Sequence, residues 1–387
     1  MLLALGMVPA ATSVRASNHA AVGTPDRENR IVLDLPPGPD NPRNSEGAFL
    51  DLKDGGILFV YSHFVGASSN DAASACLAAR FSYDGGETWS KHDTILLRPT
   101  ARQAMNVMSV SLLRMKNGDI GLFYLVRRSW HDTRMELMRS SDEGRTWGPP
   151  VECMPAAGYF TVNNDRVVRL DTGRLVIPAS AFRNLSDVND PSAVDWRGIA
   201  TFFLSDDDGR TWRVAPGFCT LPVPCTRTGL QEPGVVELPN GVLWGWARTD
   251  LGRQYQFFSW DHGETWSQPE PSQFTSPASP LSMKRIPGTD RLLAVWNPVP
   301  SYPTRSVGLV GGDRTPLVLA TGAGVGPDHW SAPIEIEGND GRDAGYAYTA
   351  IHFLKRAVLL AYCAGGAEDR VMLNRLRLRK IGYAWIK

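Results

Sequence analysis

The sequence predicts an all-β protein, a six-bladed β-propeller with four-stranded antiparallel blades. The chain of 387 residues has 37 glycines, 28 prolines and 12 tryptophans, a composition that favours turns and strands over helices. Short apolar runs bounded by Gly, Pro, Asn or Asp follow one another, and helical periodicity is nearly absent. One turn motif also recurs at intervals of about 60 residues, the length of four strands with their turns.

The strand-like runs are spread over the whole chain and give about four strands to each interval. They are residues 55–64, 75–82, 119–126, 135–141, 166–170, 173–180, 199–205, 234–239, 241–248, 254–260, 291–297, 315–321, 348–354 and 357–363. We expect strands from the two chain ends to pair in the last blade, because this closes the ring and removes exposed sheet edges.

The repeated motif is Ser-x-Asp-x-Gly-x-Thr-Trp. It occurs at 82–90, 140–148, 205–213 and 259–267, and a degenerate copy ends at Trp330. The carboxylate can accept backbone N–H groups of a turn, the glycine supplies positive φ, and the indole packs on the sheet. We therefore predict that the box carboxylates support the fold and are not catalytic. They are Asp84, Asp142, Asp207 and Asp261.

Charge and hydropathy exclude some classes of partner. Lys and Arg total 40 and Asp and Glu total 40, so the net charge is zero, unlike the basic excess of a dedicated nucleic-acid binder. No stretch of 18 apolar residues is present, so we expect no membrane span. A local basic pocket remains compatible with this balance.

Residues 1–27 are expected to lie outside the fold, and residues 28–387 to form the propeller. The segment MLLALGMVPAATSVRAS resembles the apolar and cleavage regions of a secretory signal, although its first basic residue is Arg15. It is either such a signal, with export to the periplasm or the extracellular space, or a disordered tail.

The five cysteines give no metal or redox motif. No pair has CxxC spacing, and an odd number cannot pair completely within one chain. Cys219 and Cys225 are close enough in sequence to pair, but we favour five buried thiols.

The boxes resemble the Asp-boxes (BNR repeats) of the sialidase, or neuraminidase, superfamily of six-bladed propellers. Such boxes also occur in sorting receptors, other glycosidases and polysaccharide lyases, so the function must be argued from residues outside them. The resemblance implies three arginines that bind the substrate carboxylate, a Tyr nucleophile with a Glu partner, and an Asp acid/base. Guanidinium groups suit a carboxylate because their planar fork binds it bidentately.

The second half of the chain fits this pattern. Residues 231–248 resemble the segment with the Glu partner and one arginine, which indicates Glu232 and Arg248. Glu237 is the competing carboxylate.

The remaining arginine and the nucleophile follow further along the chain. Residues 311–321 place Arg314 as another arginine, with Arg305 as the alternative. Residues 345–363 resemble the strand pair that carries the nucleophile, and Tyr348 fits better than Tyr346.

The first half departs from the pattern. Residues 42–56 lack the Arg-Ile-Pro motif of typical sialidases. Arg43 is near enough to serve as the first arginine, and Glu46 is the alternative residue to enter the pocket. Asp71, in a loop of small residues, lies where the resemblance places the acid/base.

Two further segments are candidates for substrate contact. Asn163, Asn164, Asp165 and Arg166 stand immediately before a strand, which suggests that Arg166 or Asn164 touches substrate; the alternative is a turn with a salt-bridged arginine. Trp130 and His131 form a candidate sugar platform.

Together the resemblance implies an exo-acting, exo-α-sialidase-like glycoside hydrolase that releases terminal sialic acid with retention and needs no cofactor. Its partner would be a sialylated or other acidic glycan. Two alternatives stay open: a propeller hydrolase or lyase for another anionic sugar such as a uronic acid, and a non-catalytic glycan-binding propeller.

Overall fold

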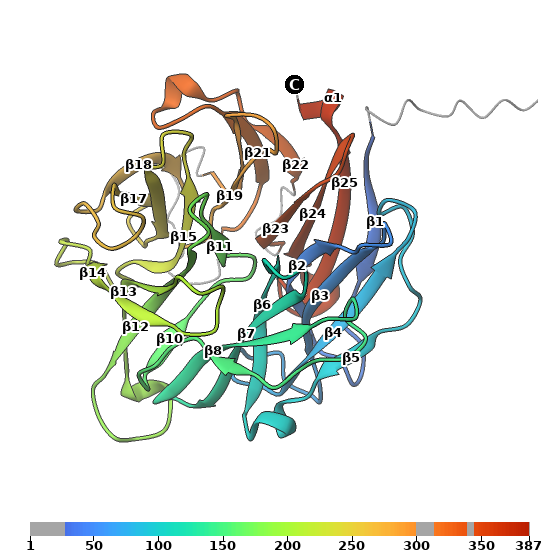
Figure 1. Cartoon of the computed structure of the whole chain (residues 1–387), viewed down its shortest axis with the longest axis horizontal. Helices are drawn as coiled ribbons and strands as arrows, with labels where there is room; N and C mark the ends of the chain where they lie inside the picture. The colour runs from blue at the N-terminus through green and yellow to red at the C-terminus, as the bar shows by residue number, and fades with distance from the viewer. Residues whose placement is uncertain (1–27, 299–312, 339–343, 387) are drawn as a thin grey trace, which may run out of the picture.

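The computed structural model describes residues 28–298, 313–338 and 344–386. The signal-like segment 1–27 and Arg305 lie outside the described residues. Within them the chain is all-β, and its sheets follow one another around a common centre (Figure 1). The predicted all-β class is therefore confirmed.

Four of the five sheets have four strands paired antiparallel, as predicted. The first contains β2 (Asn44–Asp51), β3 (Ile57–Phe64), β4 (Ala75–Ser82) and β5 (Thr94–Leu97). The second contains β15 (Gln231–Glu237), β16 (Leu243–Arg248), β17 (Arg253–Ser259) and β18 (Glu270–Thr275). The third contains β19 (Ser282–Arg285), β20 (Leu292–Trp296), β21 (Leu317–Gly322) and β22 (Ile334–Glu337). The fourth contains β1 (Asn29–Leu35), β23 (Ala347–Phe353), β24 (Ala357–Ala364) and β25 (Arg375–Gly382).

The fifth sheet has nine strands, so six separate four-stranded blades are not observed. Its strands are β6 (Asn106–Arg114), β7 (Ile120–Ser129), β8 (Asp132–Ser140), β9 (Val151–Glu152), β10 (Tyr159–Thr161), β11 (Val168–Arg169), β12 (Leu175–Asn184), β13 (Val194–Ser205) and β14 (Arg213–Cys219). A single parallel pair, Tyr159 with Thr133, joins β10 to β8. Sequence patterns could not anticipate this bridge, because it depends on how two neighbouring hairpins meet in space.

Short helices lie between or after the strands. They are η2 (Pro99–Arg102), η3 (Pro191–Ala193), η4 (Pro327–His329), η5 (Ala367–Asp369) and α1 (Tyr383–Ile386).

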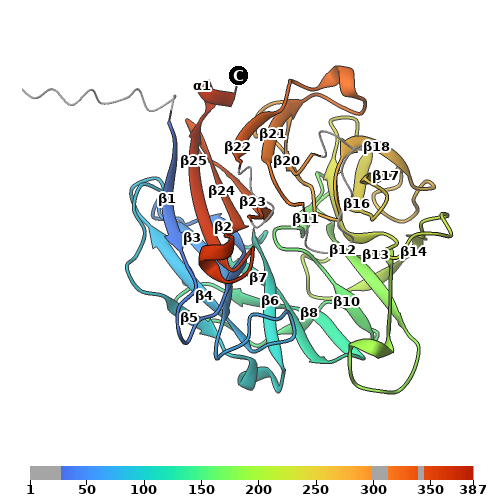
Figure 2. The same ribbon diagram turned by 180° about the vertical axis from the view of Figure 1, so that it is seen from behind.

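The two ends of the described chain meet in one sheet. β1 pairs antiparallel with β25, and Figure 2 shows the first strand beside the last from behind. Since β1 covers the outer edge of β25, this pairing closes the arrangement as expected and protects a sheet edge.

All four box turns share the same four hydrogen bonds, formed by the Ser, Asp, Gly and Thr of the motif. In the second, the Asp142 carboxylate accepts the Thr146 backbone N–H at 2.8 Å and the Thr146 hydroxyl at 2.6 Å, and Ser140 Oγ accepts the Gly144 N–H at 2.8 Å. The Thr146 hydroxyl and backbone bonds lower the pKa of Asp142 to about 2. These partners all lie within the turn, which is what a structural carboxylate requires.

The box tryptophans pack against strands that precede their own hairpin in the chain. Trp266 stacks on Phe202 of β13 with ring centroids 4.1 Å apart. Trp212 contacts Phe123 of β7 edge-on at 6.1 Å. Each repeat therefore fastens its turn to the previous part of the ring. The same kind of packing involves Trp89, Trp147 and Trp330.

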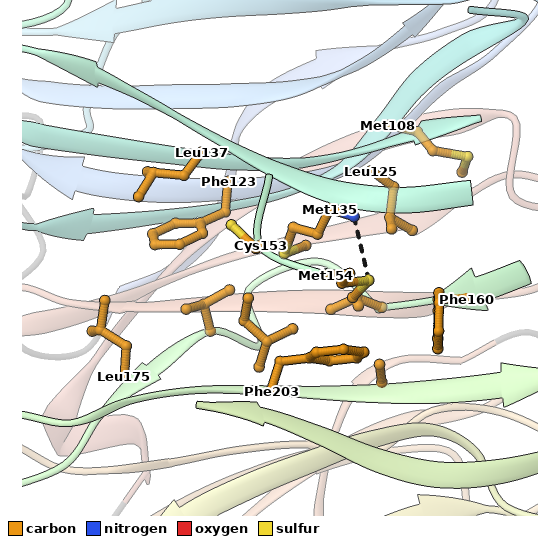
Figure 3. Packing of buried hydrophobic residues seen from close by; sticks show 14 of the residues in the cluster. Met108, Phe123, Leu125, Met135, Leu137, Cys153, Met154, Phe160, Leu175 and Phe203 are labelled. Atoms are coloured by element: carbon orange, nitrogen blue, oxygen red, sulfur yellow. Dashed lines mark hydrogen bonds between the residues drawn. The ribbon is translucent and has the colours of Figure 1, made fainter. Parts of the chain in front are cut away.

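Figure 3 shows a core cluster formed mainly by the nine-strand sheet, to which Phe64 and Ala75 of the first sheet also belong. Phe160 of β10 meets Phe203 of β13 edge-on, with ring centroids 5.4 Å apart. The Met135 backbone N–H donates to Met154 Sδ at 3.4 Å, and the Phe123 side chain is fully buried beside them. Burial of each such side chain contributes about 1.5–3 kcal/mol, so this core fixes the strands that carry one wall of the cavity described below.

All five thiols are free in the structure. Cys76, Cys153, Cys219 and Cys363 are buried as predicted. Cys225 is exposed, which corrects the expectation of five buried thiols, because it lies in a loop between β14 and β15 and not in a strand.

Candidate active site

A cavity of about 650 Å³ lies where strands of different sheets converge. Four of its lining residues have positive φ: Glu46 (47°), Ser109 (56°), Glu232 (49°) and Tyr348 (61°). Each sits at a register shift near the start of its strand, in β2, β6, β15 and β23. Such bulges re-aim a side chain, and the backbone strain of about 1–3 kcal/mol per residue must be offset elsewhere.

Polar groups of neighbouring strands hold these bulges in place. Ser62 Oγ of β3 accepts the Ser109 N–H at 3.1 Å, and Ser180 Oγ of β12 accepts the Glu232 N–H at 2.7 Å. Asn164 Nδ2 donates to the carbonyls of Gly47 at 2.8 Å and of Tyr348 at 3.1 Å. Backbone groups freed by the bulges are thus satisfied, which stabilises the site geometry.

Tyr348, Glu232 and Arg248 form one connected group. Arg248 Nη1 donates to the Tyr348 hydroxyl at 3.3 Å, and its Nη2 lies 3.1 Å from Glu232 Oε1. The other Glu232 oxygen, Oε2, is buried with no hydrogen-bond partner among the described residues. Burial, followed by the charge of Glu232, raises the pKa of Tyr348, and the nearby arginines only partly oppose this. The net effect on the pKa is upward, so the environment favours the phenol over the phenolate.

The guanidinium of Arg314 packs against the ring of Tyr348. It lies 5.2 Å from the ring centre, and Nη2 donates to the Ala278 carbonyl at 3.1 Å. It forms no ion pair with a carboxylate of the described residues. A cation that has no acidic partner among the described residues, next to Arg248, can receive an anionic ligand.

Asp71 stands at the cavity with a side chain that is 68% exposed, on the loop between β3 and β4. Arg43 binds it, and this contact is the main cause that lowers the pKa of Asp71. Arg43 Nη2 also donates to Ser45 Oγ at 2.9 Å and lies 3.6 Å from Glu46 Oε1. Arg43 is buried behind these two acids and is not itself a lining residue.

Glu46 lines the cavity. In the segment that departs from the family pattern, it is the alternative to Arg43 expected from the sequence. Its side chain is buried, and Oε2 accepts the Ser109 hydroxyl at 2.6 Å. Burial raises the pKa of Glu46 to about 7, which outweighs the opposing effects of Arg43 and Ser109. A carboxyl with this pKa can both donate and accept a proton near neutral pH.

An aromatic wall, formed by Trp130, Tyr159, Phe182 and Trp196, borders the cavity. Trp130 stacks on Tyr159 with ring centroids 5.5 Å apart, and Trp196 meets both rings edge-on. The guanidinium of Arg127 lies on this wall, 5.0 Å from the Trp130 ring centre. The wall includes Trp130 of the expected sugar platform, whereas His131 is bound to Val188 O and is not a lining residue.

The structure does not bring Arg166 into this cavity. Its guanidinium donates to the Leu281 carbonyl and lies 5.5 Å from the Trp246 ring centre, beside a smaller pocket. Its neighbour Asp165 accepts the Ile351 N–H at 2.9 Å and pairs with Lys284 at 2.7 Å. Both residues join separate sheets near the centre, which corresponds to the structural alternative, although Arg166 binds a carbonyl and no carboxylate.

The two competing residues, Glu237 and Tyr346, both lie outside the cavity. Glu237 lies outside the cavity, where its Oε2 accepts the Asp171 N–H at 2.7 Å. Tyr346 packs against Tyr362 in a hydrophobic cluster. Among the chosen residues, Asp71, Glu232, Tyr348, Arg248 and Arg314 line one cavity.

Sequence reasoning missed Arg127, Ser109, Tyr159 and Trp196. The only available signal was that Arg127 follows the apolar run 119–126, at the end of a predicted strand. Within the described ranges no group of three or more His, Cys, Asp or Glu side chains could hold a metal ion, and no described helix is long and apolar enough to cross a membrane.

The box turns and the ring of antiparallel sheets define a BNR-repeat protein with the fold of solved sialidase structures. More narrowly, the chain belongs to the BNR repeat-like domain family, whose model matches residues 60–354. No functionally curated protein matches it.

Several solved structures share the fold. A protein of unknown function from Dyadobacter fermentans is 18% identical, with a TM-score of 0.66 over 92% of this chain and 99% of that one. The leech intramolecular trans-sialidase, solved with 2,7-anhydro-Neu5Ac, is 15% identical, with a TM-score of 0.67 over 93% and 71%. The intramolecular trans-sialidase from Ruminococcus gnavus, solved with oseltamivir carboxylate, is 15% identical, with a TM-score of 0.65 over 93% and 98%. At these identities the likeness is one of fold.

Proposed function

We propose that this protein is an exo-acting glycoside hydrolase of sialidase type that releases terminal sialic acid from glycans. The observation that carries the proposal is that Tyr348, Glu232, Arg248, Arg314 and Asp71, contributed by separate parts of the chain, line one cavity. The nine-strand sheet then corresponds to two joined blades, which would give six in all. Export through the segment 1–27 belongs to the same proposal.

In the first half-reaction Tyr348 Oη attacks the anomeric carbon while the glycosidic C–O bond breaks. Glu232 takes the phenolic proton, and Asp71 gives a proton to the leaving oxygen. A base is needed because burial raises the pKa of Tyr348. A neutral nucleophile suits this substrate because the sugar already carries a carboxylate.

In the second half-reaction Asp71 takes a proton from water, water displaces the tyrosine, and Glu232 returns the phenolic proton. The configuration is therefore retained.

Asp71 must be protonated to act, and its contact with Arg43 opposes this. We propose that the substrate carboxylate replaces Asp71 at Arg43 and completes a clamp with Arg248 and Arg314. Loss of the Arg43 contact removes the main cause of the lowered pKa of Asp71, so substrate binding itself prepares the acid.

A hydrolase for another acidic sugar, such as a uronic acid, is the second candidate. The observation that favours it is Glu46, a buried cavity carboxyl with a pKa of about 7 beside an arginine already paired with Asp71. In that case Glu46 acts as the general acid instead of Asp71.

The test is a screen of purified protein on paired sialosides and uronides, with the released sugar identified. Release of free sialic acid with retention supports the first function. Release of a uronic acid, abolished by Glu46→Gln but not by Asp71→Asn, supports the second. No release from either series, with ligand binding intact, contradicts both.

A further inference from the structure

Arg127 of β7 is a buried cation that the proposed reaction does not use. Its side chain lines the cavity, and the residue is 5% exposed. It forms no ion pair or side-chain hydrogen bond with another described residue, and its Nε is buried without a partner. Leaving a buried guanidinium unpaired costs free energy, so a built site of this kind favours an anionic ligand.

The surroundings of Arg127 supply two aromatic faces but, among the described residues, no ion-pair partner. The guanidinium lies 5.0 Å from the Trp130 ring centre and 5.4 Å from that of Tyr159. The charge of Arg127 contributes to the lowered pKa of Asp71, but the Asp71 carboxylate forms its hydrogen bond with Arg43. Aromatic faces hold the planar group in one orientation and exclude water from it.

The other arginines in or directly behind the cavity differ from Arg127 in position and pairing. Arg43 and Arg248 already contact acids, and Arg314 lies on Tyr348. Arg43 directly precedes β2, Arg248 ends β16 and Arg314 lies just before β21. Arg127, in contrast, belongs to the nine-strand sheet. The described cavity lining thus holds one cationic group around Tyr348 and a separate buried cation on the aromatic wall. Its fourth arginine, Arg227, is exposed.

We propose that Arg127 is a second anion-binding subsite, and that the substrate carries a second anionic substituent, a sulfate ester or a carboxylate, on the sugar that faces the aromatic wall. This inference rests on the proposed function for the position of the reacting sugar. Bidentate pairing in a desolvated site predicts that doubly anionic ligands bind about 10- to 100-fold more tightly than singly anionic ones.

The first experiment is independent of turnover. Crystals of the wild-type protein and of Arg127→Gln are soaked in selenate, and anomalous density is measured at the aromatic wall. We expect a selenate on the Arg127 guanidinium of the wild-type protein and none in the variant. Selenate found only at Arg248 and Arg314 would overturn the subsite.

The second experiment compares three probes by calorimetry with Tyr348→Phe protein: a sialylgalactoside, its galactose sulfate ester and the matching sialylgalacturonide. The sulfate and uronide arms distinguish the two sources of charge. Preference for either doubly anionic probe should disappear in Arg127→Gln and persist in part in Arg127→Lys.

The matched control is Arg128→Gln, because Arg128 is adjacent but pairs with Glu136 outside the cavity. Equal binding of all three probes by the parent, or equal weakening of all three in Arg127→Gln, would overturn the proposal. Absence of sialic acid release together with selenate at Arg127 would refute the proposed function and leave the subsite standing.

Discussion

The box turns and the floor of the cavity both use carboxylates beside positive-φ backbone, yet they satisfy them differently. In the box, the Asp142 partners are within four residues, and Gly144 has a φ of 85°. In the cavity, Glu46 binds Ser109, 63 residues away, and Glu232 retains a buried oxygen without a partner. Positive-φ backbone therefore does not by itself mark the site; in the cavity it is combined with buried carboxylates whose partners are distant or, among the described residues, missing.

The largest expected effect is on the nucleophile. Tyr348→Phe should lower kcat on the best acidic glycoside by about 10³-fold or more, because the phenolic oxygen that forms the covalent bond is removed. Kinetics with Tyr346→Phe provide the matched control, since that tyrosine is also largely buried but packs outside the cavity. Near-normal turnover by Tyr348→Phe would exclude the tyrosine mechanism.

The second largest effect is expected at Asn164, whose side-chain amide connects the bulges of β2 and β23. Asn164→Ala should reduce kcat by about 10- to 100-fold and also destabilise the fold, because the carbonyls of Gly47 and Tyr348 lose their donor. Steady-state kinetics and urea unfolding would measure the two effects. Asn164→Asp, which keeps the size but removes the donor, should be equally impaired; wild-type activity in it would show that the link does not position Tyr348.

A smaller effect should appear in the pH dependence of stability. The pKa of Glu46 is raised to about 7 from an ordinary value of 4.5, so the folded state holds its proton more tightly than the unfolded state. Stability from this group is full below pH 4.5 and is lost as the pH rises through 7, by about 3 kcal/mol.

Urea unfolding between pH 4.5 and 8 would measure this dependence. In Glu46→Gln, the decrease in the free energy of unfolding that is due to Glu46 should be absent. An unchanged slope in Glu46→Gln would mean that Glu46 is ionised throughout the range.

The smallest effect on activity is expected at the boxes. Asp142→Ala should lower Tm by about 2–4 °C and leave kcat within about twofold, because its partners all lie in the turn. Its pKa is lowered to about 2, so its contribution to stability is present above pH 4 and is lost as the pH falls through 2. Thermal unfolding with Asp187→Ala as an exposed control checks this. A large loss of kcat at unchanged Tm would show that the box carboxylate is catalytic and not structural.

Much of the fold could be predicted because its signals are local and repeated. The box motif contains its own hydrogen-bond partners and its own tryptophan, so four copies at regular spacing fix the turns and count the hairpins. Tyr348 and Glu232 were placed by motif resemblance, and the structure brings both into one cavity. The bridge between Tyr159 and Thr133 left no trace in the sequence pattern.

The all-β class, the box turns and the residue types available for chemistry follow from the sequence alone, since they depend on neighbours within a few positions. Which of these residues meet depends on how the strands pack in three dimensions. This packing buries Arg43 behind Asp71 and Glu46, places Arg166 outside the cavity and leaves Arg127 unpaired on an aromatic wall among the described residues. The physical reason is that bulges, burial and long-range charge pairs set where a side chain points and how it titrates, and these arise only when distant strands pack around one centre.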